Sequence, residues 1–450
     1  MEKAMMVRYL GFVLGTMFSV GLGLAQEMNQ ADSTGKPLVT NATSLISLAK
    51  RLTIDGHYAE AEPVFEEALK SVRRSQNQED PEVGFFLNDL SDLYRLRNRY
   101  VEAEQYLRES ISIAERSDTQ GDLLMAMTLH NWAQLEVAKA NYPQAEALYQ
   151  KALLIWRKSL GPKHPTVATA LNNLGELYRI QGRYVEAERL YGQALAIRKV
   201  SVNPDDSAMA ATLNNLGVLY YMEAQYERSE PLLREALKIR EKYLGKDHPD
   251  TASSLNNVAE LLRARNPHTS PEFLYHRALR IWESSFGLDH PTVALGLANL
   301  GNLYLGEGKS RKAIPLLERS SLIRERVLGP DHPELAGSLC SLATAYSHIG
   351  RPDKAEPLFL RALAIRQERL GSRHPLVART EASLAEVYHR QHRYAEAQAL
   401  LAAALSAMES SLPAQSPEAI ACLKLYQSVS QKMRSQTQAI STQGAVNSLR

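Results

Sequence analysis

The 450-residue sequence predicts an all-α protein, an α-solenoid of nine helix-turn-helix repeats. The first observation is a regular period: His-Pro recurs in steps of 42 or 84 residues, at His164, His248, His290, His332 and His374. The second is that apolar residues between these marks follow a helical spacing. The third is that a chain of this length is too long for one compact core. Repeats that stack on their neighbours bury apolar surface without needing such a core.

The first 25 residues predict a secretory signal peptide. Lys3 and Arg8 precede an uncharged, mostly apolar run from Leu10 to Leu24, and small residues at Gly23 and Ala25 offer a cleavage site. The alternative is an uncleaved anchor, although the run is short for a membrane span of about 20 residues. We therefore expect an exported protein, in a bacterial periplasm or secreted, or one held in the inner membrane by this segment. Residues 26–37 are expected to form a disordered linker.

Residues 38–416 hold nine copies of the repeat without insertion or deletion. In the fourth copy, apolar residues from Leu171 to Tyr178 have the i, i+3, i+4, i+7 spacing of one face of a first helix, helix A. Gly182 tolerates the left-handed conformation that ends a helix, and helix B follows. The Ala194 slot of helix B holds only Ala or Ser in all nine copies. We expect close helix contacts there, because a larger side chain would overpack them.

Two places in the array depart from the regular repeat. In the sixth copy Ser270 and Pro271 predict a cap and a first helical turn, so helix B should begin late, at Glu272. After the repeats a single amphipathic helix over 417–433 is expected to cover the exposed end of the stack. Residues 434–450 are expected to be a disordered tail.

Composition excludes several classes of protein. The 52 Lys and Arg against 50 Asp and Glu argue against a nucleic-acid binder, which usually has a basic excess. The two cysteines, Cys340 and Cys422, rule out a disulfide scaffold and are expected to be unpaired, because they lie two repeats apart. None of the common nucleophile, phosphate-loop, zinc-protease or calcium motifs occurs. We expect no enzyme activity, no metal and no cofactor.

The five His-Pro histidines invite a metal site, but a helix cap is the better interpretation. The same slot holds Asp80, Asp122, Asp206 and Ser416 in the other copies, and Asp and Ser are good N-cap residues. Proline then stands at the first helical position. Each packed helix that separates successive copies adds about 8–10 Å, so the histidines of two copies are too far apart to bind the same ion.

The motif LNNLGELYRIQGRYVEAERLYGQALAIR, residues 171–198, resembles the tetratricopeptide repeat, in the 42-residue form of the kinesin light chain and nephrocystin-like group. The resemblance covers residues 38–416. It implies a right-handed superhelix of tetratricopeptide-type repeats whose helices A line a concave groove that binds peptide segments of partners. It does not imply a motor, because no heptad coiled coil precedes the repeats.

A stripe of amides marks the predicted groove. The slot opposite the apolar face of helix A holds Asp89, Asn131, Asn173, Asn215, Asn257, Asn299, Ser341 and Ser383. An amide is both donor and acceptor, as an extended peptide backbone is at every residue, and in the resembling families the matching asparagines hold the ligand backbone. We predict that Asn131, Asn173, Asn215, Asn257 and Asn299 face solvent and bind a peptide. The alternative is a structural amide that bonds between adjacent helices A.

Flanking slots predict the specificity of this groove. Arg179 and Arg263 are placed at its edge, each beside a glutamate, with an apolar patch between them that includes Val218, Tyr221 and Met222. The alternative for each Arg/Glu pair is a solvated, mutually neutralising surface.

The expected function is a non-enzymatic scaffold for protein or peptide partners, with no nucleic acid, and with membrane contact only if the N-terminal segment is uncleaved. The alternative is a structural spacer or oligomerisation scaffold that uses the convex face and the array ends. The sequence leaves the oligomeric state open.

Overall fold

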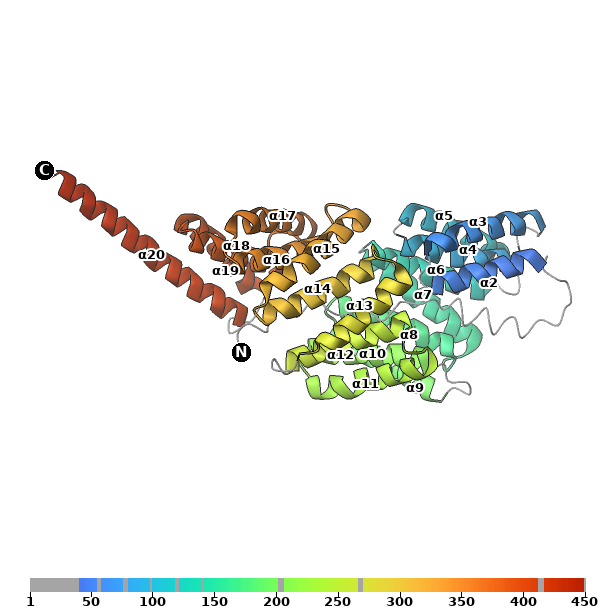
Figure 1. The fold of residues 1–450 in the computed structure, drawn as a ribbon. Coiled ribbons are helices and arrows are strands. Elements are labelled where there is room, and N and C mark those ends of the chain that lie inside the picture. The colour runs from blue at the N-terminus through green and yellow to red at the C-terminus, as the bar shows by residue number, and fades with distance from the viewer. Residues whose placement is uncertain are drawn as a thin grey trace. The chain divides into compact units, whose positions relative to one another are not determined.

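The structure, a computed structural model, describes residues 40–54, 58–75, 80–97, 99–117, 121–139, 141–200, 206–265, 270–411 and 417–448. Within these ranges all regular structure is helical (Figure 1). The predicted signal peptide of residues 1–25 and the predicted linker of residues 26–37 lie outside the described residues. No helix in the described part of the chain is long and apolar enough to cross a membrane.

The helices of the described ranges form nine A/B pairs, as the sequence predicted. Helices A are α2 (Thr40–Ile54), α4 (Pro81–Leu96), α6 (Gly121–Ala138), α8 (Pro165–Ile180), α10 (Asp206–Met222), α12 (Pro249–Arg265), α14 (Pro291–Gly306), α16 (Pro333–His348) and α18 (Pro375–Arg390). Helices B are α3 (Tyr58–Ser75), α5 (Tyr100–Arg116), α7 (Tyr142–Leu160), α9 (Tyr184–Lys199), α11 (Tyr226–Tyr243), α13 (Glu272–Phe286), α15 (Ser310–Leu328), α17 (Pro352–Leu370) and α19 (Tyr394–Ser411). The predicted late start of α13 at Glu272 is confirmed.

Histidine caps begin five of the helices A. In each, the histidine Nδ1 accepts a hydrogen bond of 3.1–3.2 Å from the backbone N–H two residues later, at His164, His248, His290, His332 and His374. Asp80 caps α4 in the same way through Oδ1, at 3.0 Å. The cap interpretation is therefore confirmed, and no group of His, Cys, Asp or Glu among the described residues could hold a metal ion.

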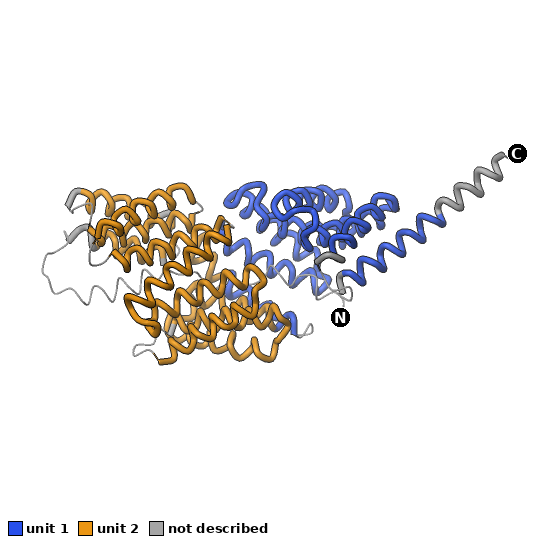
Figure 2. Tube along the Cα trace, turned by 180° about the vertical axis from the view of Figure 1, so that it is seen from behind, with its two compact units in different colours: residues 1–11, 262–279, 288–450 blue, residues 12–261, 280–287 orange. Residues whose placement is uncertain are grey.

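The described chain divides into two compact units, shown in Figure 2. The N-terminal unit comprises residues 40–261 and 280–287, and the C-terminal unit comprises residues 262–279 and 288–448. The same interlock recurs in both units. The small slot of helix B is 0% exposed in all nine copies: Ala68, Ser110, Ala152, Ala194, Ala236, Ala278, Ser320, Ala362 and Ala404. Complete burial of small side chains is what brings consecutive helix backbones close together.

The last helix is longer than expected. Helix α20 (Pro417–Ser448) packs on α18 and α19, and its residues Cys422 and Val429 are buried. We expected a cap of residues 417–433 followed by a disordered tail, but the helix continues to Ser448. After Pro417 this segment contains no second proline and is rich in Gln, Ala and Ser, so nothing in it terminates a helix early.

One residue in α18 conflicts with its environment. Glu381 occupies the slot that holds leucine in all eight earlier helices A, as at Leu339. The side chain is 6% exposed, and its Oε2 is buried without a hydrogen-bond partner among the described residues. Burial raises the pKa of Glu381 from 4.5 to about 7. A raised carboxyl pKa favours the folded state below pH 4.5, and this contribution is lost as the pH rises toward 7.

Replacing this carboxyl is expected to stabilise the C-terminal unit. Glu381→Leu should raise the free energy of unfolding by about 2–3 kcal/mol at pH 8 and by less at pH 5, where the carboxyl is protonated. Urea unfolding at the two pH values measures the difference. Glu381→Gln is the control, since it removes only the ionisation and should recover only the pH-dependent part. Equal gains for Glu381→Leu at both pH values would contradict the prediction.

Candidate functional site

The five asparagines predicted to face solvent are buried. Their exposed fractions are 5% for Asn131, 3% for Asn173, 3% for Asn215, 0% for Asn257 and 1% for Asn299. The prediction of a solvent-facing stripe is therefore wrong at these positions. The physical reason is that the side of helix A opposite its apolar face is covered by the neighbouring helices A.

In the N-terminal unit these amides form an amide ladder, which we define as the bonds between side chains of adjacent helices A at a spacing of 43 residues. The bonds join Asn131 Nδ2 to Asn88 Oδ1 at 3.2 Å, Asn173 Nδ2 to His130 Nε2 at 3.0 Å, Asn215 Nδ2 to Asn172 Oδ1 at 3.3 Å and Asn257 Nδ2 to Asn214 Oδ1 at 2.9 Å. Buried polar groups require such partners. The ladder matches the structural alternative considered for this slot.

The flanking residues are not a solvated edge either. Arg179 is 7% exposed and donates two hydrogen bonds to Glu176, at 2.9 and 2.7 Å. Its Nη1 lies 2.9 Å from the sulfur of Met222. Burial and the adjacent Glu176 carboxylate raise the pKa of Tyr191, whose hydroxyl donates to that carboxylate at 2.8 Å. The Arg179–Glu176 pair is thus a buried ion pair, which orders the interior of the unit.

The predicted apolar patch is also internal. Val218 and Tyr221 are 4% and 3% exposed, and Met222 is half-buried. Arg263 is half-buried and belongs to the C-terminal unit, whereas Arg179 belongs to the N-terminal unit. Val218 and Tyr221 therefore offer no exposed apolar patch.

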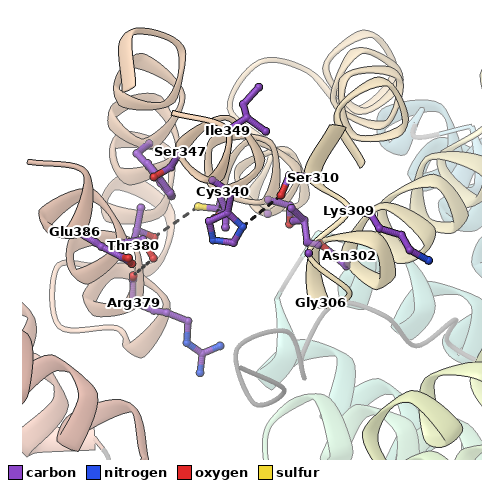
Figure 3. A pocket seen from close by; sticks show the side chains of 18 of the residues that line it. Asn302, Gly306, Lys309, Ser310, Cys340, Ser347, Ile349, Arg379, Thr380 and Glu386 are labelled. Carbon is purple, nitrogen blue, oxygen red and sulfur yellow. Dashed lines mark hydrogen bonds between the residues drawn. The ribbon is translucent and has the colours of Figure 1, made fainter. Parts of the chain in front are cut away.

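A groove of about 810 Å³ instead lies along α14, α16 and α18 in the C-terminal unit. Figure 3 shows side chains from all three helices around it. Its walls include Asn302, Leu305, Gly306, Lys309, Ser310, Arg311, Lys312, Gly337, Cys340, Ser341, Thr344, Ser347, His348, Arg366, Leu376, Arg379, Thr380, Ser383, Glu386 and Arg390. We call this feature the C-terminal groove. It spans the helices A of the last three repeats.

The C-terminal groove uses the side of helix A that the sequence selected, but in later copies of the repeat. In α8 the helical spacing puts Thr169, Glu176 and Ile180 on the same side as Asn173. All four positions have counterparts in the lining of the groove. These are Gly337 and Arg379 for Thr169, Ser341 and Ser383 for Asn173, Asn302, Thr344 and Glu386 for Glu176, and Gly306, His348 and Arg390 for Ile180. None of these lining residues was among the predicted site residues.

The groove opens where the amide ladder stops. In α16 and α18 the ladder asparagine is replaced by Ser341 and Ser383. The partner slots 43 residues earlier hold Ala298 and Cys340, which carry no amide. Two short side chains cannot span the gap that a pair of amides spans, so space remains between the helices. This simultaneous loss at both slots is the sequence signal that would have located the groove.

The chemistry inside the groove is that of hydrogen bonding. Arg366 Nη1 donates to Thr380 Oγ1 at 2.6 Å, and Cys340 Sγ lies 3.9 Å from the same hydroxyl (Figure 3). The Ser310 hydroxyl lies 3.4 Å from His348 Nδ1. Burial raises the pKa of the Cys340 thiol. A protonated thiol is a poor nucleophile, so these contacts suit binding better than covalent catalysis.

Comparison with protein families agrees with the repeat pattern. The family profile described as Tetratricopeptide repeat matches residues 40–116, 124–199, 208–269, 274–321, 299–368 and 341–410. A second profile with the same description matches residues 251–292. No curated protein sequence matches the chain.

Two solved structures with TM-scores above 0.5 show the same fold. A Rap protein complexed with competence and sporulation factor is 15% identical with a TM-score of 0.52, over 79% of this chain and 100% of that chain. The apo quorum sensor NprR from B. thuringiensis is 15% identical with a TM-score of 0.52, over 76% and 92%. A kinesin light chain-type protein of Podosopora anserina with nearly identical TPR-like repeats is 24% identical with a TM-score of 0.38, over 46% and 98%.

The repeat profile matches most of the chain between residues 40 and 410, and the nine helix pairs carry the small, buried slots that such repeats need. The chain therefore belongs to the tetratricopeptide repeat family.

Proposed function

We propose that this protein is a non-enzymatic protein-interaction scaffold that binds an extended segment of a partner protein in the C-terminal groove. One observation carries the proposal: a groove of about 810 Å³ crosses the helices A of three successive repeats. This volume falls in the range of protein clefts that bind ligands, roughly 300–1,000 Å³.

The lining of the groove suits a peptide backbone. Ser341, Thr344, Ser347 and Ser383 present hydroxyls along α16 and α18. Thr344 and Ser383 already donate to the carbonyls of Cys340 and Arg379, but every hydroxyl oxygen keeps a lone pair that can accept from the N–H groups of an extended chain. These hydroxyls would thus do what we had expected of the asparagines. The Rap protein of similar fold is complexed with competence and sporulation factor, which supports the idea that a fold of this kind accommodates a bound partner.

Filling the groove should abolish binding without harming the fold. Gly306 lies in α14 on the groove wall, and a Cβ built there meets nothing within 4 Å. A leucine can therefore project into the groove, while replacing a helical glycine favours the helix. Peptides selected on the immobilised full chain from a random phage-displayed library are expected to bind Gly306→Leu at least about tenfold more weakly, a cost of about 1.4 kcal/mol.

Gly192→Leu is the matched control, because Gly192 is exposed in α9 and a Cβ there also meets nothing within 4 Å. Both variants should melt at or above the temperature of the unchanged protein. Selected peptides that bind Gly306→Leu as well as they bind the control would refute the groove proposal. Concentration-dependent self-association that survives Gly306→Leu would instead favour a spacer or oligomerisation scaffold.

A further inference from the structure

The C-terminal groove carries a strong local excess of positive charge. Its lining includes six basic side chains, Lys309, Arg311, Lys312, Arg366, Arg379 and Arg390, but Glu386 as its one acidic side chain. The whole sequence is nearly balanced, with 52 Lys and Arg against 50 Asp and Glu. The excess is therefore a property of this surface and does not follow from the overall composition.

The positive residues stand on two sides of a neutral centre. Lys309, Arg311 and Lys312 lie at the start of helix α15, whereas Arg379 and Arg390 lie on α18. The intervening helix α16 presents uncharged hydroxyl and thiol side chains, and His348 near its end. Figure 3 shows Lys309 and Arg379 on opposite sides of Cys340.

Internal pairing cancels only part of this charge. Glu386 accepts from Arg390 Nη2 at 2.5 Å, and Lys309 lies 2.7 Å from Glu307, outside the groove lining. Arg366 is buried against Thr380. Arg311 and Lys312 are exposed at the rim, so the groove keeps a positive field toward solvent. A concave surface lined by one sign of charge concentrates ligands of the opposite sign.

We propose, resting on the proposed function of this groove, that the bound segment is acidic, with a cluster of Asp or Glu next to a short stretch of small uncharged residues. The acidic cluster matches the exposed Arg311 and Lys312 at the start of α15, and the small residues match α16. Single-stranded nucleic acid is also anionic, but it is usually held by stacking on aromatic rings. Phe359 in the lining is only 2% exposed, and His348 is the one accessible ring there, so the groove offers no row of rings on which successive bases could stack.

The test is fluorescence anisotropy on the full chain with three labelled peptides, each a short run of serine next to a run of glutamate, glutamine or lysine. At about 0.1 M salt the glutamate peptide should bind at least about tenfold tighter than the glutamine peptide. The gap should close at about 1 M salt, where the Debye length falls from about 10 to about 3 Å.

A double charge reversal at the rim, Arg311→Glu with Lys312→Glu, should remove this preference. The matched control is Lys151→Glu with Lys238→Glu, which reverses two exposed lysines on helices B of the N-terminal unit. The control should keep the tenfold preference. Loss of the preference in both double variants would contradict a role for the groove charge.

The remaining outcomes separate the two proposals. Equal binding of the glutamate and glutamine peptides, both lost in Gly306→Leu, would overturn the acidic segment and keep the groove. Failure of the glutamate peptide to bind would overturn the acidic segment, and the phage-selected peptides would decide on the groove independently. A uridine oligonucleotide is the alternative ligand to be tested. If it bound more tightly than the glutamate peptide, and if Gly306→Leu abolished that binding, the acidic segment would be overturned in favour of nucleic acid.

Discussion

Changing Asn173, Asn215 and Asn257 together to alanine is expected to destabilise the N-terminal unit by about 3–9 kcal/mol. Each asparagine donates to a side chain 43 residues earlier and is at most 3% exposed. Removing it leaves a buried acceptor without its partner, at about 1–3 kcal/mol for each site. Urea unfolding followed by circular dichroism measures the loss.

Gln193→Ala in α9 is the control, because this amide is exposed and its removal should cost no more than about 0.5 kcal/mol. Measuring both stability and peptide binding on the triple variant distinguishes a structural role of the amides from a role in binding a ligand. Unchanged stability with lost peptide binding would mean that the amides face a ligand, against the bonds seen here.

Acid is expected to weaken the N-terminal unit through His130. The ring is 0% exposed and lies between Tyr149 and Trp156, with centroid distances of 5.0 and 5.3 Å. Burial, with a smaller effect of the Arg95 charge, lowers the pKa of His130 from 6.5 to about 3. The folded state therefore resists a proton that the unfolded chain accepts below pH 6.5. Stability should fall by about 1.4 kcal/mol per pH unit below that value, or about 3 kcal/mol at pH 4.

The replacement His130→Asn tests this directly, because asparagine fills the same slot at Asn172, Asn214 and Asn256. The variant should be less stable at pH 7, since the smaller side chain packs less well, but its loss between pH 7 and pH 4 should be smaller by about 3 kcal/mol. His276→Asn, at an exposed site in α13, should follow the unchanged protein. If His130→Asn loses as much stability on acidification as the unchanged protein, another group must carry the acid sensitivity.

Local chemistry explains why the helix pairs could be predicted. In the His-Pro slot the histidine side chain accepts a hydrogen bond from the first turn of the helix. The proline lacks an N–H, but at this position an N–H would have no partner within the helix. Both effects involve residues only a few positions apart in the sequence. The Ala194 slot is similar, because its size alone limits what can pack there. Such signals need no knowledge of distant neighbours. The continuation of α20 past residue 433 differs from the prediction because polar composition alone favours disorder, whereas the segment contains no helix-breaking proline.

The asparagines show where prediction from one helix stops. Helical periodicity correctly placed Asn173 on the side of the helix opposite Leu171. It could not show which neighbouring residues cover the side on which Asn173 lies. In a stack of repeats, the covering group is a side chain 43 residues away, as His130 is for Asn173. Only the packing of adjacent helices A reveals whether such a residue meets water or a partner. The same packing locates the C-terminal groove at Ser341 and Ser383, where neither slot supplies an amide.

Sequence alone therefore determined the repeat, the caps and the helix pairs of this protein, because these depend on contacts within one period. The tertiary structure decided which helix faces are closed and which are open. That outcome depends on whether side chains of neighbouring repeats are long enough, and polar enough, to meet across the gap.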